Sequence, residues 1–389
     1  MSSVRNIGVV TVGRSDFGIY RSLLVELASD DRFALQVFAG GMHLSTKHGE
    51  TWRDIERDGF KVSAKAETGD AGDSESEIAA AMGAGLTAFG RIYASHRPDI
   101  LIVLGDRYEM FAAAAASVPY RIPLAHIHGG ETTEGAMDEV FRHSITKMSH
   151  LHFVSTQEHG NRVRQMGEEP WRITVCGAPG LDAVRDFHSM DPERVAQRIG
   201  MALNTPPLLV TYHPATLEDM EPACQIEQVL KGLADWRGPI VFTGVNADTG
   251  SCSIRRAIDG FVERSTAACC VENLGTEAYF SLMKCAAAMV GNSSSGLIEA
   301  PSFGLPVVNI GLRQQGRTRG VNVIDTPCES GAIASSIERA TRPDFRRLLA
   351  GMENPYGDGH AAQRIIDRLA HCTIDGRLLT KKFHDLSLV

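Results

Sequence analysis

The sequence predicts an α/β protein with two parallel β-sheets, each covered by helices. Short runs rich in β-branched residues alternate with segments of helical periodicity, which is the pattern of consecutive βαβ units. The alternation occurs twice, and a tract rich in Pro, Arg and Asp at residues 179–207 separates the two sets. With 389 residues, of which 43% are hydrophobic and 22% charged, the chain is long enough for two domains of ordinary size. We therefore expect two Rossmann-like domains that face each other across a cleft.

The first domain is expected to span residues 1–180. Its strands are predicted at residues 7–12, 34–39, 100–104, 123–127 and 151–155. A helix should follow the first strand, because large apolar residues recur there at helical spacing: Phe17, Tyr20, Leu23, Leu24 and Leu27.

The second domain is expected to span residues 181–360, and the tail at 361–389 is expected to return to the first domain. Strands are predicted at residues 208–212, 240–243, 268–271, 287–290 and 307–310. In open parallel sheets, ligands bind beyond the carboxyl ends of the strands. Two facing domains would therefore place the active site in the cleft between them.

The most informative segment is 289–309, which is typical of a strand, a turn lined by hydroxyl groups, a short helix and a second strand. Ser293 and Ser294, with the free backbone N–H groups of a helix start, can bind a diphosphate without a metal ion. Glu299, one turn further, can accept hydrogen bonds from a ribose diol. The alternative is an ordinary helix cap followed by a crossover between two strands.

Charged residues follow the predicted strands of the first domain. Arg14 stands in a glycine turn, before a helix that Ser15 or Asp16 would cap, and can hold phosphate. Asp106 and Arg107 follow the run at 100–104. As an alternative, these two residues form a solvated surface pair, which contributes little to stability.

Histidines raise the alternative of a metal site. His126 and His128 share a strand face and stand close to Glu131, and His150 and His152 repeat this spacing. We expect no metal, because the histidines end a strand rather than lie one turn apart on a helix, and no third ligand is fixed nearby.

The second domain contributes further polar residues at its strand ends. These are His213 before a proline, Asn246, and a set of downstream arginines: Arg313, Arg317 and Arg319. His213 either terminates its strand as an ordinary polar residue, or grips a phosphate or exchanges a proton.

Several classes of function are disfavoured. A nicotinamide enzyme should carry G-x-G-x-x-G after its first strand, but only Gly13 and Gly18 are there, and no Walker phosphate loop occurs. A net charge of −8 disfavours nucleic-acid and anionic-membrane surfaces. The eight cysteines are scattered without a C-x-x-C pair, and neither a secretion leader nor a membrane-spanning run is visible. We expect a cytoplasmic protein with reduced thiols, a small-molecule substrate and no cofactor.

Seven motifs together resemble a known family. They are Gly13-Arg-Ser-Asp-Phe17, Gly105-Asp-Arg107, His126-Ile-His-Gly-Gly-Glu131, Arg142-His-Ser-Ile-Thr-Lys-Met-Ser-His150, Tyr212-His-Pro214, Gly291-Asn-Ser-Ser-Ser-Gly296 and Arg313-Gln-Gln-Gly-Arg317. In this order they resemble the hydrolysing UDP-N-acetylglucosamine 2-epimerases of sialic and related nonulosonic acid synthesis, from about residue 7 to about residue 370. The resemblance implies the two-domain glycosyltransferase-B fold, a homodimer or homotetramer, and no metal or nicotinamide.

The resemblance also implies a reaction. The C2 proton of a hexosamine is not acidic, because no carbonyl group is attached to that carbon. Without a nicotinamide, inversion at C2 requires loss of the anomeric group. UDP would leave C1 and a base would take the C2 proton, giving a 2-acetamidoglucal. Water would then add to release free N-acetylmannosamine.

By the same resemblance, most motif residues receive roles. The diphosphate would be held by Arg14, His213, Ser293, Ser294 and Arg313. Glu299 would bind the ribose, and Asn246 would lie beside the nucleotide. Acid and base at the sugar would be Asp106, Glu131 and Asp138, with pKa values separated by burial and mutual repulsion, and Arg107 would orient or neutralise them.

One residue departs from the family pattern. The sialic-acid enzymes carry Glu at the position of His128, and their loop before Asp138 is one residue shorter. His128 would act as a base or reshape the sugar pocket. A C4 acetamido group, as in UDP-N,N'-diacetylbacillosamine of legionaminic acid synthesis, would require such a change, so both sugars stay open as substrates.

Two alternatives come from other classes of protein. A glycosyltransferase with the same fold would transfer the sugar to an acceptor. A sugar-nucleotide sensor would bind without reaction, but several buried carboxylates beside a diphosphate disfavour it.

Overall fold

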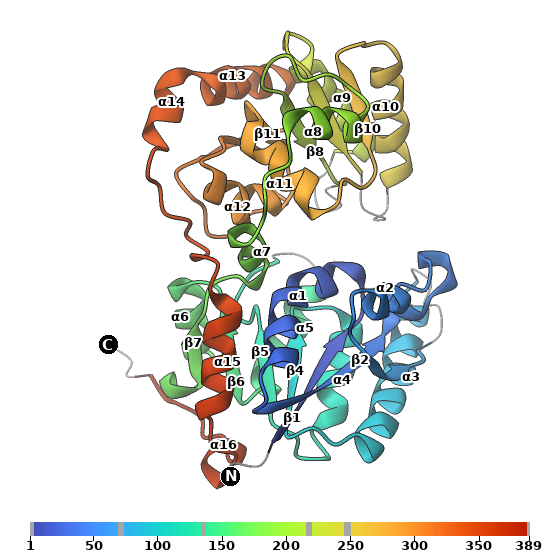
Figure 1. Cartoon of the computed structure of the whole chain (residues 1–389), viewed down its shortest axis with the longest axis vertical. Coiled ribbons are helices and arrows are strands. Elements are labelled where there is room, and N and C mark those ends of the chain that lie inside the picture. The colour runs from blue at the N-terminus through green and yellow to red at the C-terminus, as the bar shows by residue number, and fades with distance from the viewer. Residues whose placement is uncertain (1–3, 69–73, 134–136, 215–219, 245–249, 387–389) are drawn as a thin grey trace. The chain divides into compact units, whose positions relative to one another are not determined.

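The computed structural model of the chain describes residues 4–68, 74–133, 137–214, 220–244 and 250–386. The chain forms two compact units (Figure 1): Met1–Asp182 with Gly357–Val389 make up unit 1, and Ala183–Tyr356 make up unit 2. Each unit contains one sheet whose strand pairs are all parallel. The predicted α/β class with two parallel sheets is therefore confirmed.

The sheet of unit 1 has the strand order β3-β2-β1-β4-β5-β6-β7. Its strands are β1 (Arg5–Thr11), β2 (Phe33–Gly40), β3 (Val62–Ala66), β4 (Ile100–Leu104), β5 (Leu124–Ile127), β6 (Leu151–Val154) and β7 (Ile173–Val175). The five predicted strands of this unit are confirmed, whereas β3 and β7 were not predicted.

Helices cover both faces of this sheet. The elements are α1 (Arg14–Ser29), α2 (Trp52–Arg57), α3 (Glu75–Ser95), α4 (Tyr108–Ser117), α5 (Met137–Met148), α6 (Gln157–Gln165), α15 (Ala361–His371) and α16 (Gly376–Leu379), with the short 3₁₀ turns η1 (Gly41–Leu44), η2 (Thr46–His48), η3 (Pro170–Arg172) and η4 (Pro179–Leu181). The short helix α7 (Asp182–Arg185) starts at the last residue of the Met1–Asp182 stretch and continues into unit 2. The apolar face predicted for α1 is buried, and α1 packs with α15 in one core (Figure 1). A second core in the same unit includes α3 and α4.

The carboxyl-terminal segment is bound to unit 1 by buried polar contacts. The Asp182 carboxylate accepts hydrogen bonds from the backbone N–H groups of Ala361 and Ala362 at 2.8 and 2.7 Å, so it caps α15. Arg172, which is 1% exposed, donates to the carbonyl groups of Arg377 and Leu378 at 2.8 and 2.9 Å. These bonds compensate the burial of the guanidinium group.

The sheet of unit 2 has the strand order β10-β9-β8-β11-β12-β13. Its strands are β8 (Leu208–Thr211), β9 (Ile240–Thr243), β10 (Ala268–Val271), β11 (Ala288–Gly291), β12 (Val307–Ile310) and β13 (Val323–Thr326). Its helices are α8 (Pro192–Ile199), α9 (Pro222–Leu233), α10 (Ser251–Glu263), α11 (Thr276–Cys285), α12 (Ser295–Ile298), α13 (Ser330–Thr341) and α14 (Pro343–Leu348), with the 3₁₀ turn η5 (Ala300–Phe303). All five predicted strands of this unit are confirmed, and β13 was not predicted.

Two further findings concern the described residues as a set. None of their helices has the length and apolarity needed to cross a membrane. All eight cysteines are free, and Cys176, Cys328 and Cys372 are buried.

Candidate functional site

Three neighbouring strands of unit 1 end in polar residues. Asp106 follows β4, His128 and Glu131 follow β5, and Ser155 follows β6. The register pairs the last residue of β4 with the last of β5, and β5 with β6, so these strand ends are adjacent. The predicted gathering of acidic and basic side chains at one rim of this sheet is thus present within unit 1.

Arg142, on α5, joins two of these strand ends. Its side chain is 4% exposed and forms an ion pair with the Asp106 carboxylate. It also donates to the carbonyl group of His128 at 3.0 Å and to the hydroxyl group of Thr133 at 2.9 Å. We predicted no role for Arg142, although its place four residues after Asp138, on the same helical face, is a usable signal.

Glu131 is the centre of a second buried cluster. Its carboxylate accepts a hydrogen bond from Ser155 Oγ at 2.7 Å and a very short one from His128 Nδ1, and His159 Nδ1 lies 3.9 Å away. Burial alone would raise the pKa of Glu131, but the charges of His128, Arg142 and His159 and the hydrogen bond from His128 lower it well below its ordinary value. Glu131 is therefore an ionised buried carboxylate.

Asp138 has the opposite shift. Burial, and then the charge of Asp106, raise the pKa of Asp138 above its ordinary value. The pKa values of Glu131 and Asp138 are thus shifted in opposite directions, as two groups with different acid–base roles require. For Glu131 the cause differs from the mutual repulsion that we predicted, because cationic neighbours dominate.

Arg107 makes its direct contacts with residues other than the catalytic carboxylates that we predicted as its partners. Its guanidinium group hydrogen-bonds to Glu109 at 3.3 Å and contacts Met42 Sδ at 3.2 Å. The buried Asp16 is also nearby, and burial raises the pKa of Asp16 to about 6 while Arg107 opposes this rise. Among the described contacts it is Arg142 that binds Asp106, whereas Arg107 acts on Asp138 only through its charge.

Arg14 is solvent-exposed at the start of α1. Its side chain is 68% exposed, and its guanidinium group forms an ion pair with Asp54 at 3.4 Å. The residue before α1 is Gly13, which has no side chain to cap the helix, and Asp16 accepts instead from the N–H group of Val12 at 3.1 Å. The prediction that Ser15 or Asp16 caps α1 is therefore wrong, whereas Arg14 is accessible to a phosphate.

The other histidines of unit 1 have structural partners. His126 contacts the Gly105 carbonyl at 2.8 Å and the Thr146 hydroxyl at 3.1 Å, and burial lowers the pKa of His126 to about 3. His152 is bound to the buried Glu168 at 3.0 Å. Within the part of the chain that the structure describes, no group of three potential metal ligands is assembled.

A pocket of about 400 Å³ lies in unit 2, beyond the carboxyl ends of β8, β9 and β10. Its walls include Thr211, Thr243, Gly244, Glu272, Asn273, Tyr279, Ser295 and Glu299. Tyr279 is half-buried, and the burial of its hydroxyl group raises the pKa of that group. Glu299, predicted to bind a ribose, thus lines a pocket at the edge of the sheet where ligands of such folds bind.

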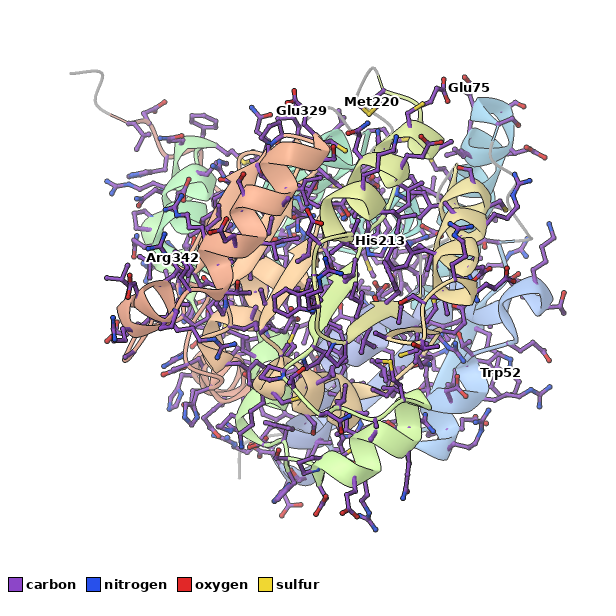
Figure 2. The ribbon with its side chains drawn as sticks, turned by 90° about the horizontal axis from the view of Figure 1, so that it is seen from above. Trp52, Glu75, His213, Met220, Glu329 and Arg342 are labelled. Atoms are coloured by element: carbon purple, nitrogen blue, oxygen red, sulfur yellow. The ribbon has the colours of Figure 1, made fainter. Side chains whose placement is uncertain are left out.

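Asn292 organises the turn after β11. Its carboxamide accepts from the backbone N–H group of His213 and donates to the carbonyl group of His213, both at 2.8 Å. Its own carbonyl group accepts from Arg313 Nη1 at 3.1 Å. Asn292 therefore holds together two residues predicted to bind the diphosphate, and His213 is labelled in Figure 2. We predicted no role for Asn292, although it stands directly before the serines.

The serine turn itself has the predicted strand–turn–helix–strand order. Gly291 has φ +140°, and a Cβ there would lie 1.9 Å from the Thr211 carbonyl oxygen, so only glycine fits. Ser294 occupies the cap position of α12 without a side-chain cap bond, and Ser293 Oγ accepts from the N–H group of Ser295 at 3.4 Å. Ser294 therefore does not cap α12 with its side chain, as the alternative of an ordinary helix cap would require. Asn246 lies outside the described residues.

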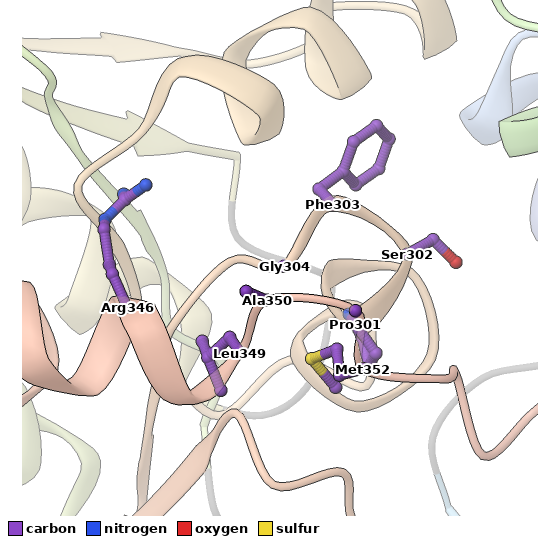
Figure 3. Close-up of a pocket in the computed structure, with 9 residues that line it drawn as sticks. Pro301, Ser302, Phe303, Gly304, Arg346, Leu349, Ala350 and Met352 are labelled. Carbon is purple, nitrogen blue, oxygen red and sulfur yellow. The ribbon is translucent and has the colours of Figure 1, made fainter.

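A second pocket of unit 2 lies near the amino ends of the strands, at the other end of the sheet from the first pocket. It has a volume of about 340 Å³ and lies between η5 and the segment after α14 (Figure 3). Arg346, at one side of it, donates to the carbonyl groups of Ala286 and Ala287 before β11 begins. This pocket is thus separate from the serine turn, which follows the other end of β11.

Comparisons with known proteins agree on one family. The profile of the family described as UDP-N-acetylglucosamine 2-epimerase matches residues 25–370. The chain is 36% identical to the GDP/UDP-N,N'-diacetylbacillosamine 2-epimerase (hydrolyzing) of Campylobacter jejuni, over 99% of this chain and 100% of that protein. It is 34% identical to the UDP-N,N'-diacetylbacillosamine 2-epimerase (hydrolyzing) of Legionella pneumophila, over 97% and 99% of the two chains.

Solved structures share the fold. The crystal structure of UDP-GlcNAc 2-epimerase from Neisseria meningitidis bound to UDP-GlcNAc superposes with a TM-score of 0.79 at 18% identity, covering 94% of this chain and 99% of that one. A putative UDP-N-acetylglucosamine 2-epimerase from Listeria monocytogenes gives a TM-score of 0.76 at 18% identity, covering 94% and 96%.

Proposed function

The chain belongs to the UDP-N-acetylglucosamine 2-epimerase family, and we propose that it eliminates UDP from a UDP-linked 2-acetamido sugar and hydrates the product to the free 2-epimer. The observation that carries this proposal is the pair of carboxyl groups with opposite pKa shifts, Glu131 and Asp138, at one rim of the unit 1 sheet. Elimination and hydration need one group that takes a proton and one that gives a proton. A glycosyltransferase or a sensor has no need for such a pair.

We assign the acid role to Asp138, because a carboxyl group with a raised pKa retains its proton closer to neutral pH. Asp106 stays beside it as a charge held by Arg142. We assign the base role to the cluster around Glu131, which is ionised. Arg107 contributes positive charge near Asp138.

The nucleotide is assigned to unit 2. We propose that the pocket lined by Glu299 binds the uridine and that Glu299 accepts from its ribose hydroxyl groups. Ser293, Ser294, His213 and Arg313 would hold the diphosphate, because the Asn292 contacts gather His213 and Arg313 around the serine turn. Arg14 and Asn246 are further proposed contacts of the nucleotide. These donors would stabilise the negative charge that the leaving group gains.

For the sugar, we propose UDP-N,N'-diacetylbacillosamine as the better of two substrates. Two hydrolysing relatives, each matching at least 97% of this chain, carry that sugar in their names. UDP-N-acetylglucosamine is the second candidate, because a UDP-N-acetylglucosamine 2-epimerase of Neisseria meningitidis is 30% identical over 87% of this chain.

The test is to incubate the purified protein with each nucleotide sugar in turn and to measure UDP release together with the free sugar formed. We expect UDP and a free 2-epimer in equal amounts, with the higher kcat/KM for the diacetylated sugar. A higher kcat/KM for UDP-N-acetylglucosamine would reverse the substrate assignment. Release of UDP only after addition of an acceptor would instead indicate a glycosyltransferase.

Assembly and location remain proposals. We propose a homodimer or homotetramer in the cytoplasm. Light scattering behind a sizing column tests the first part, since a chain of 42.1 kDa would elute as a particle of about 84 or 168 kDa.

A further inference from the structure

We propose that His128 is the base that removes the C2 proton of the sugar, and that Glu131 and Ser155 are positioning residues that hold its ring. This inference rests on the proposed function and makes it specific. In this proposal one atom, Nε2 of His128, accepts the proton, and the other two residues of the cluster hold the ring in position.

The hydrogen bonds of the cluster fix the orientation of the imidazole ring. An ionised carboxylate has no hydrogen to donate, so the hydrogen between Glu131 Oε1 and His128 Nδ1 belongs to Nδ1. Ser155 Oγ donates to the same carboxylate oxygen at 2.7 Å and lies 3.3 Å from His128 Nδ1. With its Nδ1–H committed to Glu131, the neutral ring has its lone pair on Nε2. A carboxylate that fixes the tautomer of a catalytic histidine is a common arrangement.

His128 Nε2 has no hydrogen-bond partner among the described residues. The residue is only 7% exposed, so this nitrogen is also shielded from water. An unpaired buried nitrogen costs free energy, which a new hydrogen-bond partner would recover. A substrate atom that reaches Nε2 would supply the missing partner.

The backbone at His128 gives a second, independent indication. His128 has φ +64°, in the left-handed region that side chains other than glycine rarely occupy. Among the described residues, Glu50 and Arg121 are the other non-glycine residues with positive φ, and His128 is the buried one of the three. Buried backbone strain of this kind tends to occur at active sites, where it aims a side chain. The bond from Arg142 to the His128 carbonyl, at 3.0 Å, holds this conformation.

The charged and titratable groups around His128 come from several elements. They are Glu131 on the same loop, Arg142 on α5, His159 on α6, and His126 on β5. Glu131 is the anion among them. Its negative charge stabilises the positive charge that the ring gains when Nε2 takes a proton from the sugar.

The step balances as follows. Nε2 takes the C2 hydrogen as a proton, and the C2–H electron pair becomes the second bond between C1 and C2. The bond from C1 to the diphosphate oxygen breaks, and its electron pair leaves with UDP. In the hydration that follows, water supplies a hydroxyl group to C1, a proton adds to the other face of C2, and the imidazolium returns its proton to solvent.

The first test needs no turnover. In protein labelled with ¹⁵N at histidine, the signals lost in His128→Asn identify the ring nitrogens of His128. We expect wild-type protein near neutral pH to show hydrogen on Nδ1 and none on Nε2, and we expect Glu131→Gln to abolish this preference. A neutral ring with its hydrogen on Nε2 would contradict the proposal.

The second test uses His128→Gly, because glycine adopts a positive φ without strain and the variant should fold. We expect kcat to fall about 100-fold or more, with little change in KM, and added imidazole to restore part of it. Arg121→Gly is the matched control, since Arg121 also has positive φ but is exposed, and its activity should not change. If His128→Gly or His128→Asn keeps kcat within threefold of wild type, His128 is not the base.

The third test separates positioning from structure. In Glu131→Gln the anion that favours the protonated ring is gone, so the pH below which kcat falls should move to lower pH while kcat itself decreases. Ser155→Ala should lower kcat without this shift, because it removes a hydrogen bond and no charge. An unshifted pH profile in Glu131→Gln would overturn the positioning role. A wild-type protein that releases no UDP from either sugar would instead contradict the proposed function, so the two failures are distinguishable.

Discussion

The Asp106 carboxylate owes its position to a residue far along the chain. Arg142 and Asp106 are 36 residues apart in sequence, and their ion pair joins the end of β4 to α5. Arg142 also binds the carbonyl group of His128, so one guanidinium group holds both an acidic residue and the strained backbone beside it. Such a shared contact fixes the geometry of a site more firmly than separate surface pairs do.

Asp106→Asn tests the catalytic part of this arrangement. The amide keeps the shape of the side chain but loses the charge, so we expect UDP binding to stay the same and kcat to fall about 100-fold or more. Calorimetry with UDP and steady-state kinetics measure the two effects. Asp58→Asn, which changes an exposed carboxylate on the surface, is the control and should leave both unchanged. An unchanged kcat in Asp106→Asn would remove Asp106 from the mechanism.

Individual side-chain contacts, such as those of Arg142 with Asp106 and His128, could not be predicted from the sequence alone. Asp106, Glu131, His213 and Glu299 could be proposed as site residues because they follow predicted strands or stand one turn beyond. Asn292 and Ser155 were assigned no role, because what matters is which backbone or carboxylate atom they meet in the folded chain. The direct contacts of Arg107 with Glu109 and Met42 were not predicted for the same reason.

The positions of the strands were predicted better than the single contacts of the site. Central strands of a parallel sheet are buried on both faces and appear as apolar runs, so their positions were predictable. The missed strands β3, β7 and β13 are all edge strands. β3 carries a lysine and a serine, and β7 has three residues, so neither gives a run that stands out from a loop.

The turn between β11 and α12 depends on one glycine. A side chain at Gly291 would collide with the Thr211 carbonyl group, and φ +140° is unfavourable for any other residue. We expect Gly291→Ala to lower the free energy of unfolding by about 3 kcal/mol or more and to weaken UDP binding. Urea unfolding measures the first effect. Gly331→Ala in α13 is the control, because nothing lies within 4 Å of the added methyl group and alanine favours helix, so its stability should rise by up to about 1 kcal/mol. Equal stability of both variants would contradict this account of the turn.

The carboxyl-terminal segment is tied to unit 1 by a buried acid. Glu168 is bound by His152 at 3.0 Å, by Lys147 at 2.6 Å and by Lys381 of the tail. Burial opposes ionisation, but these hydrogen bonds and charges lower the pKa of Glu168 to about 2. Because the folded pKa lies below the unfolded value near 4.5, the contribution to stability is complete above about pH 5 and is lost as the pH falls towards 2.

Glu168→Gln should therefore lower stability at pH 7 by about 3 kcal/mol and make the remaining stability less dependent on pH between about 5 and 2. Urea unfolding at a series of pH values gives the comparison. Glu227→Gln removes an exposed ion pair in α9 and should change stability by less than about 1 kcal/mol. A pH dependence in Glu168→Gln equal to that of wild type would show that this acid does not anchor the tail.

Considered as one chain, the two units divide the chemistry. Unit 1 carries the carboxyl groups that we propose exchange protons, and unit 2 carries the pocket and the serine turn that we propose bind the nucleotide. The alternating pattern of strands and helices predicted both sheets, and the order of seven motifs predicted the family. The sequence motifs left the choice between two sugars open, because they are compatible with both substrates.

The claim that the chain eliminates UDP and then hydrates the product is tested most directly in D₂O. With UDP-N,N'-diacetylbacillosamine as substrate, proton NMR would follow the sugar while UDP is released. We predict a free 2-epimer that carries one deuterium at C2, because the original proton is lost in elimination and a solvent deuteron replaces it. A free sugar that keeps its original C2 proton and configuration would show plain hydrolysis at C1, and would contradict the account.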